Sequence, residues 1–443
     1  MRFSFSYFSL SRVCRILQCK SLLLISLLLM QTLMAEAQSN MPKAYPDRVI
    51  MNMAERAESS IAVTWRTSLE VPEGYLEIQS VGPGPIDKGA SKSHTALSTR
   101  ITYSYQDEPD VEAYQHAVNV NNLDSRQGYL YRVGFGNHWS EWYEFQLDKS
   151  KTDTYSFLYL GDPQNDIKSQ WSRVVRRAYA HNPSTAFVLY AGDLINRAGR
   201  DVEWQEWFDA GSYVLATVPQ AMTPGNHDYR NRELDPHWEY QFTSPGNGPD
   251  ALKHTCYYVD YRDVRIISID TAVDSELRAE DGVALELQRA WLDSILRQTS
   301  HKWVVLITHL PIYSPKESRD NHHIRSHFQP LIEQYGVDLV LTGHDHTYAR
   351  GRASDNPAQR FPIPYVVSVS GPKVYEVGDK SWIEKGGSNI QLYQEVTISG
   401  NRMRFDAFTA DGVLFDRFEL KKRANGTNRF IDLDPVKRRT PSK

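Results

Sequence analysis

Five short polar segments carry side chains that can bind metal ions or transfer protons. They are Gly161-Asp162-Pro163-Gln164, Gly192-Asp193, Gly225-Asn226-His227-Asp228, Thr308-His309 and Gly343-His344-Asp345-His346. A single segment of this kind is often only a turn whose polar side chains cap the backbone. Each of the five, however, comes where an apolar, strand-like stretch stops, and ligands of open α/β sheets bind at the carboxyl ends of strands. We therefore expect the five segments to converge on one site.

The side chains of these segments combine carboxylates, an amide and imidazoles. Such a set suits Mn, Fe, Zn or Mg better than the soft metals that prefer thiolates. The segments offer more ligands than one ion needs, and a carboxylate such as Asp193 can bridge two ions. A pair of ions about 3.5–4 Å apart can clamp a phosphoryl oxygen and activate a water molecule for in-line attack. The pattern therefore favours metal-assisted phosphoester hydrolysis.

The elements that must position these segments fall into two parts. Residues 46–147 contain short stretches of alternating hydrophobicity, separated by Gly, Pro, Asn and Ser turns, which predicts a β-sandwich. After a polar boundary at residues 149–154, strand-like and helix-like stretches alternate up to residue 341, which predicts a mixed sheet covered by helices. Helices are expected at residues 167–180, 203–213, 283–298 and 326–335. Residues 365–420 again show a strand pattern, and we expect the polar, basic residues after 423 to be loose.

The sandwich segment is rich in aromatic residues. They are Trp65, Tyr114, Tyr131, Trp139 and Trp142. We interpret them as core and edge packing, with a sugar-binding surface as the alternative.

The N-terminal segment has the order of a secretory signal peptide. Basic residues precede an apolar run at residues 22–30, and Ala35-Glu36-Ala37 offers a cleavage site after Ala37. A membrane anchor is the alternative, but the run is shorter than the roughly 20 residues that span a bilayer. We expect a secreted or periplasmic protein without a stable membrane anchor.

Composition limits the possible partners. Without residues 1–37, the 50 basic and 54 acidic residues become 46 and 53, so the formal charge moves from −4 to −7. A mildly acidic protein is a poor non-specific binder of nucleic acid. Only Cys256 remains, which excludes an intramolecular disulfide. The sequence leaves the oligomeric state open.

Together the five segments resemble the calcineurin-like metallophosphoesterases, and the preceding sandwich narrows the resemblance to the purple acid phosphatase branch. The resemblance covers nearly all of the chain after residue 37. It implies an α/β fold: a fibronectin-III-like sandwich at residues 46–148, then a calcineurin-like αββα sandwich at residues 155–420. The last strands of that domain would lie at residues 364–420, with a flexible tail at residues 424–443.

The resemblance also implies roles for the polar residues. Two divalent metal ions are expected, the first held by Asp162, Asp193 and His346, with Asp193 bridging. The second would be held by Asp193, Asn226, His309 and His344. His227 would face the substrate as a general acid or as a transition-state stabiliser. Asp228 would either orient His227 or cap the turn.

Two positions depart from the family pattern. Purple members carry a tyrosine three residues after the bridging aspartate, where this chain has Asn196, so we expect no tyrosinate colour. Many other members have Asp-x-His in the first motif, where this chain has Asp162-Pro163-Gln164. Gln164 would either donate its amide oxygen to the first metal or pack beside it.

We expect an exported phosphomonoesterase that acts on a small phosphoester with a metal-activated water molecule. A phosphodiesterase or nucleotide hydrolase on the same site is one alternative. A surface- or carbohydrate-binding protein with a decayed site is another. His323 and Arg325 are candidate substrate contacts, with a solvated basic loop as the alternative interpretation.

Overall fold

The computed structural model describes residues 40–150, 152–273, 282–354 and 363–434. The predicted signal peptide at residues 1–37 lies outside these ranges. Within them, no helix combines the length and the apolar character needed to cross a membrane. Residues from Lys43 onward form one unit, which is the part described below.

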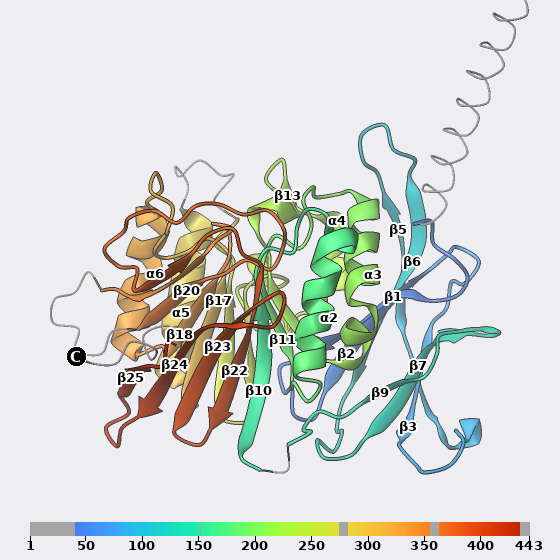
Figure 1. Ribbon diagram of the computed structural model, residues 1–443. Helices are drawn as coiled ribbons and strands as arrows, with labels where there is room; N and C mark the ends of the chain where they lie inside the picture. The colour runs from blue at the N-terminus through green and yellow to red at the C-terminus, as the bar shows by residue number, and fades with distance from the viewer. Residues whose placement is uncertain (1–39, 151, 274–281, 355–362, 435–443) are drawn as a thin grey trace, which may run out of the picture. The chain divides into compact units, whose positions relative to one another are not determined.

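The largest sheet has eleven strands (Figure 1). In sheet order they are β25 (Asn428–Asp432), β24 (Leu414–Lys422), β23 (Arg402–Thr409), β22 (Leu392–Ser399), β10 (Thr154–Leu160), β11 (Val188–Ala191), β12 (Gln220–Thr223), β1 (Asp47–Met53), β2 (Ile61–Thr67), β6 (Val111–Val120) and β5 (Leu97–Tyr103). Strands β10, β11, β12 and β1 are parallel neighbours, and the remaining pairs are antiparallel.

A second sheet has seven strands, of which β16, β17, β18 and β20 are parallel. In order they are β15 (Tyr257–Tyr261), β16 (Val264–Ile269), β17 (Trp303–Thr308), β18 (Leu339–Thr342), β20 (Pro364–Val367), β19 (Tyr348–Arg352) and β21 (Lys385–Gly387). The two smaller sheets are formed by β3 (Tyr75–Ser80), β4 (Lys92–Thr95), β7 (Tyr129–Phe135), β8 (His138–Trp139) and β9 (Tyr143–Phe145), and by β13 (Tyr229–Arg230) with β14 (Glu233–Leu234).

Helices cover the outer faces of the two large sheets (Figure 1). The helices of the described residues are α2 (Ser172–His181), α3 (Asp201–Thr217), α4 (Pro236–Gln241), α5 (Val283–Gln298) and α6 (His322–Tyr335), with a π-helical turn η2 (Ile167–Trp171) and short turns η1 (Lys88–Ala90), η3 (Asn226–Asp228) and η4 (Asp250–Leu252). Helices α2 and α3 pack against β10–β12, and α5 and α6 pack against β16–β18.

Between the sheets lies a core that includes Phe157, Leu189, Val305 and Leu341. Alternate residues of one strand serve both cores, because neighbouring side chains of a strand point to opposite faces. In β10, Phe157 packs between the sheets and Leu158 packs under the helices. This arrangement of helix, sheet, sheet and helix, preceded by a sandwich, confirms the predicted α/β fold class.

The eleven-stranded sheet runs without a break from the phosphoesterase-like part into the sandwich. Strand β1 pairs with β12 in parallel, with Asn52 opposite Gln220, and pairs with β2 on its other side. Met51 packs in the sandwich core, whereas Ile50 packs in the core under α2 and α3. The change of pattern at residues 149–154 does not reveal this shared strand.

Burial distinguishes the aromatic residues of the sandwich. Trp65 and Tyr131 are buried in its core, as predicted. Trp139 and Trp142 are partly exposed and flank the guanidinium of Arg132, at 4.2 and 4.9 Å from their ring centroids.

Two local predictions are wrong. The tail expected to be loose from residue 424 forms strand β25, which pairs with β24 from Phe418↔Asp432 to Lys422↔Asn428. Phe430 gives this strand an apolar contact with Phe418, at 5.1 Å between ring centroids, which outweighs its polar composition. Helix α6 begins at His322 rather than at residue 326, because Ile324 extends its buried stripe by one turn. Residues 435–443 lie outside the described residues.

Candidate metal centre

The predicted metal ligands follow the carboxyl ends of parallel strands in both large sheets. Asp162 follows β10, Asp193 follows β11 and Asn226 follows β12. His309 follows β17, while His344 and His346 follow β18. Their ligand atoms form two clusters that share Asp193: Asp193, His309 and His344, and Asp162, Asp193 and His346.

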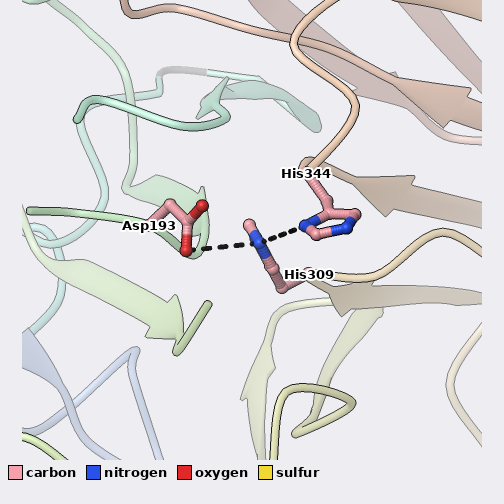
Figure 2. A group of neighbouring side chains, drawn as sticks. All are labelled: Asp193, His309 and His344. Carbon is pink, nitrogen blue, oxygen red and sulfur yellow. Dashed lines mark hydrogen bonds and ion pairs between the residues drawn. The ribbon is translucent and has the colours of Figure 1, made fainter. Parts of the chain in front are cut away.

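The first of these clusters surrounds the Nε2 atom of His309 (Figure 2). Asp193 Oδ1 lies 3.3 Å from this atom, and Asn226 Oδ1 and His344 Nδ1 each lie 3.2 Å from it. The Nδ1–H of His309 donates a hydrogen bond to the carbonyl oxygen of Ala191 at 2.7 Å. That bond leaves the Nε2 lone pair available as a metal ligand. The four residues predicted for the second metal are therefore adjacent.

The other cluster contains Gln164 between its ligand atoms. His346 Nε2 lies 3.9 Å from Asp162 Oδ1, and its Nδ1–H donates to the Lys373 carbonyl at 2.9 Å. Gln164 Nε2 lies 2.8 Å from Asp193 Oδ2 and 2.9 Å from His346 Nε2. Gln164 Oε1 is buried and has no hydrogen-bond partner among the described residues. In this orientation Gln164 packs beside the site through its NH₂ group, and a half-turn of the amide would bring Oε1 to the ligand position.

Strained backbone conformations coincide with the candidate ligands. Four non-glycine ligands have φ values in the left-handed region: Asp162 (45°), Asp193 (52°), His344 (71°) and His346 (45°). Such residues persist where the surrounding structure over-determines them, and they cluster at functional sites. Here the His344 N–H donates to both carboxylate oxygens of Asp162 at 2.9 Å, which ties the end of β18 to the end of β10.

The turn that carries Asn226 and His227 lies very close to Asp193. A Cβ atom added to Gly225 would lie 2.1 Å from Asp193 Oδ1, a distance that no side chain could tolerate. The His227 N–H donates to the same oxygen at 2.8 Å. Glycine is therefore required for this approach of turn to ligand.

Burial and mutual charge set the protonation of the cluster. Burial raises the pKa of Asp162 well above its ordinary value, against the opposing effect of His309. Burial has the same tendency at Asp193, but His309 outweighs it and lowers the pKa of that carboxyl. At His309, burial lowers the pKa and Asp193 raises it, with a result of about 9. Burial also lowers the pKa of His344 and brings that of His346 to about 3.

The lowered pKa values keep His344 and His346 neutral, which is the form that binds a metal. The pKa of His309 is raised to about 9, so a metal ion at Nε2 would take the place of a proton there. A cation between the clusters would stabilise the ionised form of Asp162, which burial otherwise disfavours. The mixture of carboxylate, amide and imidazole donors suits Mn, Fe, Zn or Mg.

His227 and Asp228 differ in their surroundings. His227 is partly exposed, and its Nδ1–H donates to the Asn196 carbonyl at 2.7 Å, so that Nε2 is directed away from this anchor. Asp228 is buried and accepts from the Gly225 N–H at 2.7 Å and the Leu194 N–H at 3.2 Å. The structure therefore favours the turn-capping role for Asp228 over the orientation of His227.

His323 and Arg325 belong to the first turn of α6 rather than to a loop. Arg325 pairs with Asp320 at 2.6 Å and its guanidinium lies over the Tyr313 ring at 5.3 Å. Neither residue belongs to the two ligand clusters found among the described residues. Their contact with substrate stays a prediction.

Two features next to the ligands have no counterpart among the predicted site residues. Asp345 is buried, accepts from the Ser314 hydroxyl at 2.6 Å and pairs with Arg319. The loop after β20 is attached to His346 by two hydrogen bonds, from His346 to the Lys373 carbonyl and from the Tyr375 N–H to the His346 carbonyl at 2.8 Å. The loop follows an apolar strand, as the five motifs do, but none of its side chains belongs to the two ligand clusters found among the described residues.

Comparisons with known proteins agree with this geometry. Residues 155–348 match the Calcineurin-like phosphoesterase family, and residues 46–147 match the Purple acid Phosphatase, N-terminal domain family. The chain is 22% identical to phosphoenolpyruvate phosphatase of Allium cepa, covering 86% of this chain and 77% of that protein. It is 25% identical to acid phosphatase type 7 of Homo sapiens, covering 73% and 75%.

Solved structures show the same fold at low sequence identity. The structure of purple acid phosphatase PPD1 from Lupinus luteus seeds has a TM-score of 0.69 at 16% identity, covering 86% of this chain and 75% of that chain. The structure of PhoD has a TM-score of 0.61 at 12% identity, covering 88% and 92%.

Proposed function

The chain belongs to the calcineurin-like metallophosphoesterases with a purple acid phosphatase N-terminal domain, and we propose that it hydrolyses phosphomonoesters at a site holding two divalent metal ions. The observation that carries the proposal is the arrangement around His309 Nε2. Three other candidate ligands approach this one atom within 3.3 Å. The ions are Mn, Fe, Zn or Mg, and Asn196 in the tyrosine position predicts that no tyrosinate charge-transfer colour is present.

When bound, the two ions supply an activated water molecule for in-line attack and neutralise the charge that develops on the phosphoryl oxygens. Asp193 serves both clusters, because Oδ1 lies beside His309 and Oδ2 beside Gln164. His227 is partly exposed, and its Nδ1 anchor leaves Nε2 to meet the substrate. We assign it the donation of a proton to the leaving oxygen, or of a hydrogen bond to the phosphoryl group.

Export is the second part of the proposal. The basic, apolar and small-residue order of residues 1–37 supports a cleaved signal peptide. N-terminal sequencing of the protein recovered from outside the cytoplasm should begin at Gln38. A mature N-terminus at Met1 would contradict export by this route.

The central test compares metal content with activity. The purified protein, stripped and reloaded with each metal in turn, should hold two ions per chain and hydrolyse an aryl phosphomonoester. Asp193→Asn and His309→Ala should each lose bound metal and most of the turnover. His94→Ala, in β4 of the sandwich, is the matched control and should keep both. Full metal content and full activity in Asp193→Asn would refute the proposed centre.

A further inference from the structure

A cavity of about 590 Å³ includes in its lining Tyr375, a residue that contacts the candidate ligand His346. It is lined by two loops, residues 316–318 and residues 374–378. The first loop lies between β17 and α6, and the second lies beyond β20. Its volume falls within the range of roughly 300–1,000 Å³ that is usual for small-molecule sites.

Tyr375 connects this cavity with the metal centre. Its ring lines the cavity and also packs against the ring of His346, with centroids 4.9 Å apart at 61°. The Tyr375 N–H donates to the His346 carbonyl at 2.8 Å, and the Lys373 carbonyl accepts from His346 Nδ1 at 2.9 Å. A molecule in the cavity that touches Tyr375 is therefore next to a candidate metal ligand.

Two ammonium groups approach the same ring. Lys316 Nζ lies 5.1 Å and Lys373 Nζ lies 5.7 Å from the Tyr375 ring centroid. Neither ammonium forms an ion pair with any carboxylate of the described residues. Lys316 is itself a lining residue of the cavity, and Lys373 directly precedes the lining residue Val374.

The two acidic residues that line the cavity accept hydrogen bonds from neighbouring protein groups. Glu317 Oε2 accepts from the Asp379 N–H at 2.9 Å, and Glu376 Oε1 accepts from the Asn389 side-chain amide at 2.9 Å. The ammonium groups of Lys316 and Lys373 are the cations that approach the Tyr375 ring among the described residues.

We propose that this cavity receives the leaving group of the substrate and selects a planar ring that carries a second acidic group. The ring would pack against Tyr375, and its carboxylate or comparable anion would bind Lys316 and Lys373. The inference rests on the proposed phosphomonoesterase function, because the phosphoryl group must occupy the adjacent metal centre. It adds a leaving-group preference that the ligand set by itself does not determine.

Two aryl phosphates that differ by one charge test the preference. The ratio of kcat/KM for 4-carboxyphenyl phosphate to that for phenyl phosphate is measured for the metal-loaded wild type and for Lys316→Gln, Lys373→Gln and Tyr375→Leu. Comparing each substrate across variants cancels its intrinsic reactivity. Each lysine substitution should lower the ratio by roughly three- to tenfold, the range of a partly solvated charge pair. Lys88→Gln, an exposed lysine of the sandwich, should leave the ratio unchanged.

Binding provides a readout that does not depend on turnover. Calorimetric titration of the metal-loaded protein with 4-carboxybenzylphosphonate and benzylphosphonate should show tighter binding of the former, and Lys316→Gln should remove the difference. If both aryl phosphates are hydrolysed with a ratio that Lys316→Gln and Lys373→Gln do not change, the leaving-group inference is wrong while the phosphatase function stands. If neither is hydrolysed under any metal, the proposed function fails and the inference with it.

Discussion

At the scale of single residues, three imidazoles of the site share one mode of attachment. His227, His309 and His346 each donate Nδ1–H to a main-chain carbonyl, at 2.7, 2.7 and 2.9 Å. This bond fixes the tautomer and the ring orientation, so that each ring directs Nε2 away from the main-chain carbonyl. The difference between a ligand and a proton donor then depends on what lies opposite Nε2. His309 and His346 face carboxylates, whereas His227 is outside both ligand clusters.

His227 is therefore expected to act on the substrate without holding a metal. We predict that His227→Gln lowers kcat by roughly 10²- to 10⁴-fold, the range of general acid–base catalysis, with unchanged metal content. Steady-state kinetics and elemental analysis of the same sample would measure both quantities. A loss of metal parallel to the loss of activity would assign His227 to the ligand set instead.

Gln164 is expected to weaken the first metal site. Its NH₂ group donates toward Asp193 and His346, two groups whose lone pairs the metal requires. We predict that Gln164→His, which supplies an imidazole acceptor in place of this donor, tightens the first-site metal by roughly ten- to hundredfold. Titration with Mn or Zn would give the dissociation constant. Gln164→Leu is the control without polar atoms, and an equal gain in that variant would show that relief of packing, rather than a new ligand, is the cause.

At the scale of elements, the site depends on how closely the strand-end turns approach one another. Gly225 permits the turn after β12 to contact Asp193, which follows β11. We predict that Gly225→Ala displaces this turn and loses metal and activity, with a destabilisation of about 1–3 kcal/mol from overpacking. Metal analysis and urea unfolding would measure these effects.

Gly84→Ala is the matched control for this substitution, because an added Cβ at Gly84 meets no atom within 4 Å. It should retain metal, activity and stability. Wild-type metal content in Gly225→Ala would show that the turn can move without weakening metal binding by the candidate ligands.

Strand β6 carries a buried histidine that makes stability depend on pH. His116 lies between the hydroxyls of Thr67, at 2.7 Å, and Ser98, at 2.8 Å, and burial lowers its pKa to about 4. Between that value and the ordinary pKa of about 6.5, the unfolded chain binds a proton that the folded chain does not. The contribution of His116 to the free energy of unfolding is therefore fully present above its unfolded-state pKa of about 6.5. It is lost as the pH falls toward the folded-state pKa of about 4.

From pH 7 to pH 5, we expect His116 to reduce the free energy of unfolding by about 2 kcal/mol. Urea unfolding of the wild type and of His116→Gln at both pH values would isolate this contribution. An equal decrease in both proteins would assign the acid sensitivity to other groups.

At the scale of the whole unit, buried charges reinforce the strand that the sandwich shares with the phosphoesterase part. Asp201, at the start of α3, pairs with Arg48 of β1 at 2.8 Å and with Arg66 of β2 at 3.2 Å. His237 of α4 also contacts Asp201, at 3.1 Å, and contacts Asp235 at 2.7 Å. Both guanidinium groups are buried, so each depends on its carboxylate partners.

Removing the Asp201 carboxylate should destabilise the contact between the sandwich and the phosphoesterase part. We predict that Asp201→Ala lowers the free energy of unfolding by about 3–5 kcal/mol, because it leaves two buried cations undercompensated. Asp209→Ala is the control: Asp209 pairs with Lys168 at the surface, and its loss should cost less than about 1 kcal/mol. Equal unfolding midpoints for the two variants would show that the ion pairs of Asp201 do not stabilise the contact between the sandwich and the phosphoesterase part.

The six metal-ligand candidates and the α/β architecture could be predicted from the amino-acid sequence. Both depend on local order along the chain. A polar residue directly after an apolar strand must lie at that strand's carboxyl end, and strands joined by helices form parallel neighbours whose ends meet. The positions of Asp162, Asp193 and His309 follow from this rule without knowledge of their partners.

Contacts between segments far apart in the chain could not be predicted from the sequence and are seen in the folded structure. The Gln164 amide contacts His346, and the Asp228 carboxylate accepts a hydrogen bond from the Leu194 N–H. The Tyr375 ring packs against the His346 ring. Strand β1 pairs with β12, and β25 lies at the sheet edge. Hydrophobic periodicity indicates which face of a segment is buried, but it does not indicate which distant segment packs against that face. Those partners depend on the packing of the folded chain.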